Sequence, residues 1–530
     1  MKITLISIYP DLWSFGLRTV SSILKKEGND VDLIFMPREF VERFPKEAVK
    51  DLVELTKDSH WAGISLMSNF WDNAIQLTEA IKENCKIPVM WGGTHATVRP
   101  NECLKHADMV CVGESEEALM EFSRKFKNKE NFYDIKGMGF NKNGEIIVNG
   151  LRELPGSKKA EIQTLDDIPF QDFDYETHYV LDENRIKKMD TNLFRKHWDH
   201  VYMTQPTRGC PFACTFCVNN TLLAMHPHQK PIRKRSVDNI ILELKLVTAK
   251  VPFIKKILFD DDAFFLMTID EIEDFSKKYK EQIGLPLRIT GATPSTLHKT
   301  KLSLLADAGL REMRMGIQTA GSDTKQLYKR PHTNDQVEKA VRMVYDQKNV
   351  EAKYDIILDS PWDTEPDTIE TLMFLSKLPA PYMLTLFSLV LFPGTDLYNK
   401  AKKEGIIKDD VNDIYRKHYH GVKKTYLNSL FMLIKDYVAV DSHLINTTVM
   451  SFLVNKKIKF INRPAALLLR LIFPLFKIKY LISKLGLIKT IKRLITNPRL
   501  LSIFPKNLNI FKSIFNKKQT YDVVTPATED

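Results

Sequence analysis

The sequence predicts an α/β protein: an open, doubly wound parallel sheet, then a partial barrel of six β/α units, then a helical, basic tail. Three observations predict this order. Short apolar strands alternate with amphipathic helices up to about residue 130, and the alternation resumes over about 201–420. A chain of 530 residues is too long for one ordinary domain. Beyond residue 420, Lys and Arg recur among Leu, Ile and Phe instead.

The first domain, residues 1–130, is predicted from regularly spaced segments. Its expected strands and helices are, in order, 2–8, 17–26, 31–35, 61–66, 73–82 and 87–91. Ligands of such sheets bind at the carboxyl ends of the strands. Two turns at those ends, G-G-T-H-A-T and V-G-E-S-E-E, supply the candidate binding residues, which are Gly92, Gly93, Thr94, His95, Gly113 and Glu114. The paired glycines allow backbone to approach a bulky ligand closely.

Residues 131–200 are predicted to link the two domains. The turn N-K-N-G at 141–144, followed by an apolar run, predicts a small hairpin. The acidic, Pro-containing stretch at 165–174 is typical of a linker that crosses a surface.

The second domain, residues 201–420, carries the motif T-R-G-C-P-F-A-C-T-F-C at 207–217. Three thiols within eight residues suit an iron–sulfur cluster, zinc or copper. Zinc ribbons and fingers usually bring a second Cys or His pair, and none follows. Three ligands leave one metal position open, as in reactive sites. We therefore expect Cys210, Cys214 and Cys217 to hold a metal or cluster rather than to be a structural or incidental group.

The remaining strands of this domain are expected at 201–204, 256–259, 287–292, 314–319, 354–359 and 383–388. Six such units imply a partial TIM-like (β/α)6 barrel, with its site at the carboxyl ends of the strands. Three carboxylates end the second strand. Because side chains alternate along a strand, Asp260 and Asp262 should share one face while Asp261 points away. Two H-x-H pairs, at 226–228 and 418–420, lack a third ligand nearby and are expected to be surface or loop histidines.

These motifs resemble the radical S-adenosylmethionine (SAM) superfamily, whose signature is C-x-x-x-C-x-x-C. The resemblance implies that the three cysteines hold a four-iron, four-sulfur cluster whose open iron binds SAM. One electron then splits SAM to a 5′-deoxyadenosyl radical. The same resemblance places Phe216 beside the adenine, and Asp260, Asp262 and Gln318 near SAM.

The first domain resembles the cobalamin-binding domain found ahead of many radical SAM domains, which implies that the two glycine turns hold cobalamin. Cobalamin mutases ligate cobalt through the His of D-x-H-x-x-G after the first strand, and the loop at 9–14 has no His. The match at 58–63 leads into a strand instead, which indicates coincidence. His95 is expected to be a polar wall residue or to start a helix rather than to bind cobalt. The alternative is a degenerate domain that has lost its cofactor.

The tail, residues 421–530, carries the basic charge of the chain. Between residues 455 and 518 there are sixteen Lys and Arg and no Asp or Glu, so the rest carries 11 − 16 = −5. No apolar run reaches the ~20 residues needed to cross a bilayer. The pattern favours helices lying in a membrane interface. The alternatives are helices that cap the barrel and, less favoured because of the high aliphatic content, nucleic-acid binding.

The six scattered or clustered cysteines and the absence of a recognisable leader fit a reducing cytosol. We expect a cytoplasmic, cobalamin-dependent radical SAM enzyme that methylates an unactivated carbon, with the inner membrane face as a candidate position. The expected partners are a small-molecule or lipid-like substrate, a membrane surface and an electron donor such as ferredoxin or flavodoxin. The alternatives are a radical SAM cyclase, rearrangement or oxidation enzyme and, from another class, a cobalamin or redox sensor.

Overall fold

The computed structural model of the chain describes residues 1–330, 332–442 and 444–485. The part of the predicted tail beyond residue 485 lies outside the described residues. The chain divides into two compact units. The first consists of residues 1–367 with 385–423, and the second of residues 368–384 with the chain from 424 onward.

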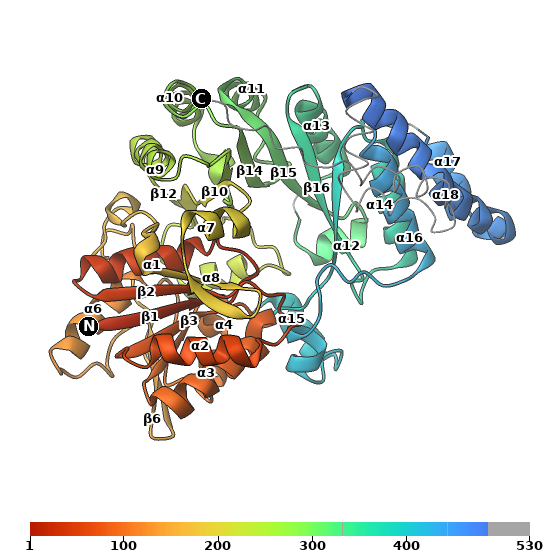
Figure 1. Cartoon of the computed structure of the whole chain (residues 1–530). Helices are drawn as coiled ribbons and strands as arrows, with labels where there is room; N and C mark the ends of the chain where they lie inside the picture. The colour runs from red at the N-terminus through yellow and green to blue at the C-terminus, as the bar shows by residue number, and fades with distance from the viewer. Residues whose placement is uncertain (331, 443, 486–530) are drawn as a thin grey trace, which may run out of the picture. The chain divides into compact units, whose positions relative to one another are not determined.

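The amino-terminal sheet of the first unit is doubly wound, as predicted (Figure 1). Its first five strands are parallel and lie in the order β5-β4-β3-β1-β2. They are β1 (Lys2–Ser7), β2 (Asp30–Phe35), β3 (Trp61–Ser65), β4 (Val89–Gly92) and β5 (Met109–Cys111). Helix α1 (Phe15–Lys26) packs beside α6 (Glu116–Lys127), and α2 (Lys46–Thr56) packs beside α3 (Trp71–Cys85). Helices on both faces explain why these strands are almost uniformly apolar.

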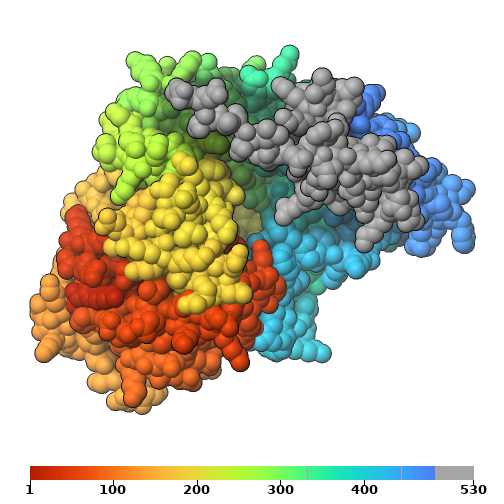
Figure 2. Space-filling model, in the orientation of Figure 1, coloured from red at the N-terminus to blue at the C-terminus, as the bar shows by residue number. Residues whose placement is uncertain are grey.

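Four strands of the predicted linker extend this sheet, two at each edge. The expected hairpin is confirmed: β6 (Met138–Lys142) and β7 (Glu145–Val148) pair antiparallel, and β6 joins β5. At the other edge, β8 (His178–Asp182) pairs with β2 and is followed by β9 (Arg185–Lys188). Figure 2 shows the yellow atoms of this second segment lying directly against the red atoms of the amino-terminal strands and helices. A short helix, α7 (Thr191–His197), leads on to the second sheet.

The second sheet has six strands in the order β10-β13-β14-β15-β16-β17, which confirms the partial barrel. The strands are β10 (Val201–Thr204), β13 (Lys256–Phe259), β14 (Leu287–Ala292), β15 (Leu310–Gln318), β16 (Glu351–Leu358) and β17 (Met383–Ser388). The helices between them are α9 (Val237–Lys250), α10 (Ile269–Gln282), α11 (Lys299–Ala308), α12 (Ser322–Leu327), α13 (Asn334–Tyr345) and α14 (Glu365–Lys377). Ser236 caps α9 as expected, its hydroxyl accepting from the amide of Asn239.

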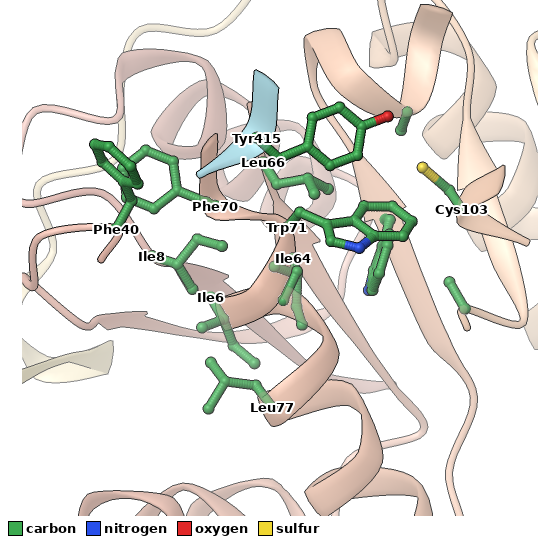
Figure 3. Close-up of a cluster of buried hydrophobic side chains, with 14 of the residues drawn as sticks. Ile6, Ile8, Phe40, Ile64, Leu66, Phe70, Trp71, Leu77, Cys103 and Tyr415 are labelled. Carbon is green, nitrogen blue, oxygen red and sulfur yellow. The ribbon is translucent and has the colours of Figure 1, made fainter. Parts of the chain in front are cut away.

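The chain beyond the barrel returns to the amino-terminal domain. Residues from Leu389 to Tyr415, including α15 (Asp396–Lys403), share one hydrophobic core with the first sheet. In Figure 3 Tyr415 lies over Leu66 and Trp71, and the rings of Tyr415 and Trp71 are 5.6 Å apart. This segment belongs to the predicted second domain by sequence, yet its apolar side chains are buried with those of the first domain. It therefore ties the barrel to the sheet.

The second unit contains α16 (Tyr426–Val438), α17 (Thr447–Val454) and α18 (Lys459–Leu485). Helix α18 packs on both other helices, and the ring of Tyr437 lies 5.3 Å from the rings of Phe473 and Phe476. None of the helices in the described part of the chain combines the length and apolar character that crossing a membrane requires.

Candidate active site

A cavity of about 800 Å³ lies inside the first unit, between the amino-terminal sheet and the cysteine loop. One wall is made by the loops that follow the carboxyl ends of β1, β3, β4 and β5, where a parallel sheet binds ligands. The opposite wall is made by the first cysteine, the loop after β13 and helix α8 (Val218–Met225). The residues of the opposite wall include Cys210, Asn219, Leu222, Leu223, Met225, Asp260 and Asp262.

The predicted glycine turns lie on the sheet wall. Gly92, Gly93, Thr94, Gly113 and Glu114 all line the cavity. Gly93 has a φ of 93°, and a Cβ added there would lie 2.8 Å from the backbone oxygen of Leu66. Only glycine fits such a position. The turns therefore expose bare backbone to the cavity, as a bulky planar ligand would need.

His95 is the one predicted residue of these turns that does not line the cavity. Its side chain is fully buried, with Nδ1 2.8 Å from the hydroxyl of Ser68 and its ring between those of Trp71 and Tyr415. Burial lowers the pKa of His95 to about 3, so the ring is neutral. The first turn of α4 (Thr94–Val98) directs this side chain into the core, which agrees with the expectation that it starts a helix.

The loop after β1 supplies lining residues that were not predicted. Tyr9, Asp11, Trp13 and Ser14 all reach the cavity, and the Tyr9 hydroxyl lies 3.2 Å from that of Ser65. These residues carry no sequence signature, because only the fold brings the loop beside the glycine turns. His60 lies just before β3, where its Nδ1 accepts from the amide of Lys2, and it does not line the cavity.

The cysteine loop is anchored by a two-stranded ribbon. Strand β11 (Thr207–Arg208) pairs with β12 (Arg233–Lys234). Gly209 follows with a φ of 93°, and a Cβ added there would lie only 2.1 Å from the backbone oxygen of Pro231. The glycine before the first cysteine is thus required for the loop to leave the ribbon.

The three cysteines differ in exposure. Cys210 lines the cavity, Cys214 is buried and Cys217 is half-buried. Burial raises the pKa of Cys210 to about 11 and that of Cys217 to about 12, so both must lose a proton to become ligands. A guanidinium nitrogen of Arg330 lies 3.5 Å from the Cys214 sulfur, a position from which it would stabilise a thiolate.

A single metal ion and an iron–sulfur cluster require different arrangements of the ligand side chains. Over the described ranges, no three His, Cys, Asp or Glu side chains converge as one metal ion requires. In an iron–sulfur cluster each cysteine binds a different iron, so the ligands need not meet at one point. The donor set therefore fits a cluster with one iron left without a protein ligand.

The three adjacent aspartates have separate roles, as strand alternation predicted. Asp260 and Asp262 line the cavity, whereas Asp261 is 2 % exposed. The carboxylate of Asp261 accepts the backbone amide and the hydroxyl of Thr207, both at 2.6 Å, and the amide of Ala263 at 2.8 Å. Burial raises the pKa of Asp261 to about 6, which still leaves it ionised at pH 7. Asp261 thus holds the start of the cysteine loop.

Phe216 and Gln318, both predicted beside SAM, do not line the cavity. Phe216 packs edge-on against Tyr328, with ring centres 5.0 Å apart. Gln318 ends β15 in a left-handed conformation, with a φ of 69°. Arg330 donates to the backbone oxygen of Gly316 at 2.6 Å and also contacts the second cysteine. The strand end that carries Gln318 therefore lies beside the buried cysteine, and its contact with SAM stays a prediction.

Glu114 connects the two walls. Its carboxylate accepts from Arg208 at 2.8 Å and from both terminal nitrogens of Arg233, one of them at 2.9 Å. Burial opposes ionisation, but the two positive charges outweigh it and lower the pKa of Glu114 to about 2. Arg208 also pairs with Glu116 at 2.7 Å. A residue predicted to bind a cofactor is thus engaged by the ribbon that carries the cysteines.

One wall includes Cys210 of the three-cysteine loop and the other exposes backbone turns, an arrangement that suits a reactive cluster facing a large cofactor. Two family models match the chain in agreement with this: that of the radical SAM superfamily at residues 204–375, and that of the B12 binding domain at residues 1–123. The chain therefore carries a B12-binding domain followed by a radical SAM domain. The cofactors of this class are a four-iron, four-sulfur cluster, SAM and cobalamin.

Curated relatives are distant but cover much of the chain. Bacteriochlorophyllide d C-8(2)-methyltransferase of Chlorobaculum tepidum is 23 % identical over 412 residues, which is 74 % of this chain and 80 % of that protein. Anaerobic magnesium-protoporphyrin IX monomethyl ester cyclase of Cereibacter sphaeroides is 23 % identical over 368 residues, which is 62 % of this chain and 54 % of the cyclase.

Two solved structures share the fold. The methyltransferase TsrM from Kitasatospora setae, with cobalamin and a [4Fe-4S] cluster bound, matches with a TM-score of 0.60 and 15 % identity over 76 % of this chain and 78 % of that one. The enzyme OxsB, with aqua-cobalamin and SAM bound, matches with a TM-score of 0.60 and 14 % identity over 97 % of this chain and 75 % of that one.

Proposed function

We propose that this protein is a cobalamin-dependent radical SAM methyltransferase that acts on an unactivated carbon. The observation that carries the proposal is the shared cavity, whose two walls are the glycine turns of the B12-binding domain and the loop of Cys210. Groups held on the two walls would face the same space. A curated relative that covers 74 % of this chain is named as a methyltransferase, which supports the reaction type.

Different residues of the chain would bind the cluster, SAM and cobalamin. When bound, the cluster and SAM supply a radical that abstracts hydrogen from carbon, and cobalamin supplies a methyl group. Cys210, Cys214 and Cys217 would bind the cluster as thiolates. Asp260 and Asp262 would accept hydrogen bonds from the SAM amino group, since both face the cavity. The glycine turns would bind cobalamin through backbone.

We also propose a large, mainly apolar substrate, of which a lipid-like molecule is one example. The proposal is supported by the wall beside the cysteines, where Leu222, Leu223 and Met225 line the cavity. Apolar walls suit such a ligand and exclude water from a radical.

A radical SAM cyclase is the second candidate. It is favoured by two curated relatives named as anaerobic magnesium-protoporphyrin IX monomethyl ester cyclases. Those reactions could use the same pair of domains, so the products must decide between the two candidates.

The remaining proposals concern partners and place. We propose a one-electron donor such as ferredoxin or flavodoxin, because cleavage of SAM in this family consumes one electron. We propose a cytoplasmic protein that lies at the inner face of the membrane. The second unit supplies the support for that position.

The test is anaerobic reconstitution with iron, sulfide and hydroxocobalamin, followed by SAM and a strong reductant. Mass spectrometry should detect both 5′-deoxyadenosine and S-adenosylhomocysteine, and Cys214→Ala should abolish both products. Deoxyadenosine without S-adenosylhomocysteine would favour the cyclase. An intact cluster that yields neither product would contradict the proposed enzymatic function. It would favour the alternative of a cobalamin or redox sensor.

A further inference from the structure

Helix α18 exposes a continuous apolar face. Phe460 is 96 % exposed, Leu467 58 % and Leu475 65 %. At 3.6 residues per turn, the large exposed side chains fall on one side of the helix. They are Phe460, Ile461, Leu467, Leu468, Leu471, Leu475 and Ile482. An apolar surface of this extent on an ordered helix marks an interaction site.

The opposite face of α18 is fixed by packing, so the exposed face has a defined direction. The rings of Phe473 and Phe476 lie against Tyr437 of α16, and the Tyr437 hydroxyl donates to the backbone oxygen of Leu469 at 2.7 Å. Asn462 is buried and donates to the backbone oxygen of Asn455 at 2.7 Å. Figure 1 shows α18 lying beside α16 and α17. The exposed leucines therefore point away from these helices.

Cations run along one border of the apolar face. Four of them recur at spacings of four and seven residues, which keeps them on one side of the helix. They are Lys459, Arg463, Arg470 and Lys477. No Asp or Glu occurs between residues 455 and 485. Arg463 lies over the ring of Tyr426, and Asp436 of α16 is an acidic group that interacts with Arg470 and Lys477.

We propose that this face of α18 docks on the surface of an anionic lipid bilayer. The apolar side chains would enter the boundary between headgroups and acyl chains, and the bordering cations would meet the lipid phosphates. The inference rests on the proposed position at the membrane, for which it names the binding surface and the lipid class, and it does not depend on the proposed reaction.

The distribution of charge favours a lipid bilayer over two other partners, a second copy of the chain and a nucleic acid. A second copy of the helix would bring the same cationic borders together without any acidic residue of α18 between them. A nucleic acid would meet the cations but leave the row of leucines without an apolar partner. Because no described helix can cross a bilayer, a helix lying in the interface is the geometry that remains.

The test uses the full chain and co-sedimentation with vesicles, without SAM or substrate. Vesicles of phosphatidylglycerol with phosphatidylcholine are compared with vesicles of phosphatidylcholine alone. The test variant is Leu471→Ser with Leu475→Ser. The matched control is Leu242→Ser with Leu246→Ser on α9, where the two leucines have the same spacing and are 49 % and 54 % exposed. Both variants replace exposed side chains, so both should fold.

We expect the wild type and the control to bind anionic vesicles and to bind phosphatidylcholine weakly. The test variant should bind about a hundredfold more weakly, at roughly tenfold per leucine removed from lipid. A wild type that stays in solution with anionic vesicles would overturn the inference. So would a test variant that binds like the control, since the chain beyond residue 485 would then carry the binding.

Two other results would assign the face to another partner. A dimer of the wild type that dissociates in the test variant, with no vesicle binding, would identify a second copy. Binding to a labelled RNA that survives the leucine substitutions but fails in Arg470→Gln with Lys477→Gln, with no vesicle binding by the wild type, would identify a polyanion such as RNA. Either result would overturn the proposal that this face of α18 docks on a lipid bilayer. None of these readouts requires SAM cleavage, so failure here is distinct from failure of the proposed reaction.

Discussion

Replacing Asp261 with Asn is expected to loosen the cysteine loop while the cavity keeps its shape. The carboxylate accepts three hydrogen bonds, two from Thr207 at 2.6 Å and one from Ala263 at 2.8 Å. Asn has a single acceptor oxygen, and its NH₂ group would face at least one N–H or O–H donor. Leaving one such buried donor without a partner costs about 1–3 kcal/mol. This corresponds to a roughly 5- to 150-fold larger population of the loosened loop.

The assay is the rate at which the reconstituted cluster loses iron to a chelator under anaerobic conditions. Asp261→Asn should lose iron faster by about that 5- to 150-fold factor. The matched control is Asp260→Asn, one residue earlier, where the carboxylate faces the cavity and accepts from Thr290 at 2.8 Å. The control should keep its cluster and lose SAM cleavage. Equal rates of iron loss in Asp261→Asn and the wild type would refute the positioning role.

The remaining predictions test other parts of the site. Glu114→Gln should destabilise the protein by about 3 kcal/mol at pH 7. The folded state lowers the pKa of Glu114 from 4.5 to about 2, so the ionised form is stabilised above pH 4.5. The melting difference from the wild type should therefore shrink as the pH falls from about 4.5 toward 2. Gly209→Ala should prevent cluster assembly, because its Cβ would lie 2.1 Å from the backbone oxygen of Pro231. The measurement is the iron bound per chain. The control is Gly150→Ala, where an added Cβ would have no atom within 4 Å, and it should bind as much iron as the wild type. Tyr415→Ala should lower stability by about 3–5 kcal/mol in thermal unfolding, because the ring fills the shared core; an unchanged melting temperature would show that the returning segment does not stabilise the sheet.

The elements of the fold could be predicted because each leaves a local signal. Apolar strands alternate with helices at a spacing that only a parallel sheet satisfies, and the strand limits agree with the structure to within a few residues. The cysteine motif and the glycine turns at 92–93 and 113 are local as well. They are short, and their chemistry follows from residue type. Strand alternation also separated Asp261 from its two neighbours correctly.

The rest depends on contacts between distant parts of the chain. Nothing local to Asp261 shows that it holds Thr207, because the two are 54 residues apart. The contact of Glu114 with Arg233 spans 119 residues. The loop at 9–14 lines the cavity only because β1 lies beside β3. The packing of Tyr415 in the core of the first domain could not be predicted for the same reason. An apolar run indicates that a segment is buried, but not which part of the protein it packs against.

The central claim is that the cavity of about 800 Å³ binds cobalamin opposite the cysteine loop. It is tested most directly by measuring the hydroxocobalamin that stays with the protein after gel filtration, in the wild type and in Gly92→Trp. Gly92 lines the cavity, and the nearest atom to an added Cβ is 3.9 Å away, so the indole can enter the cavity without a backbone clash. Gly150→Trp, at an open site outside the cavity, is the control. The wild type and the control should retain cobalamin in equimolar amount, and Gly92→Trp should lose it while keeping its cluster. Equal cobalamin in Gly92→Trp and the wild type, or none in the wild type, would contradict the account.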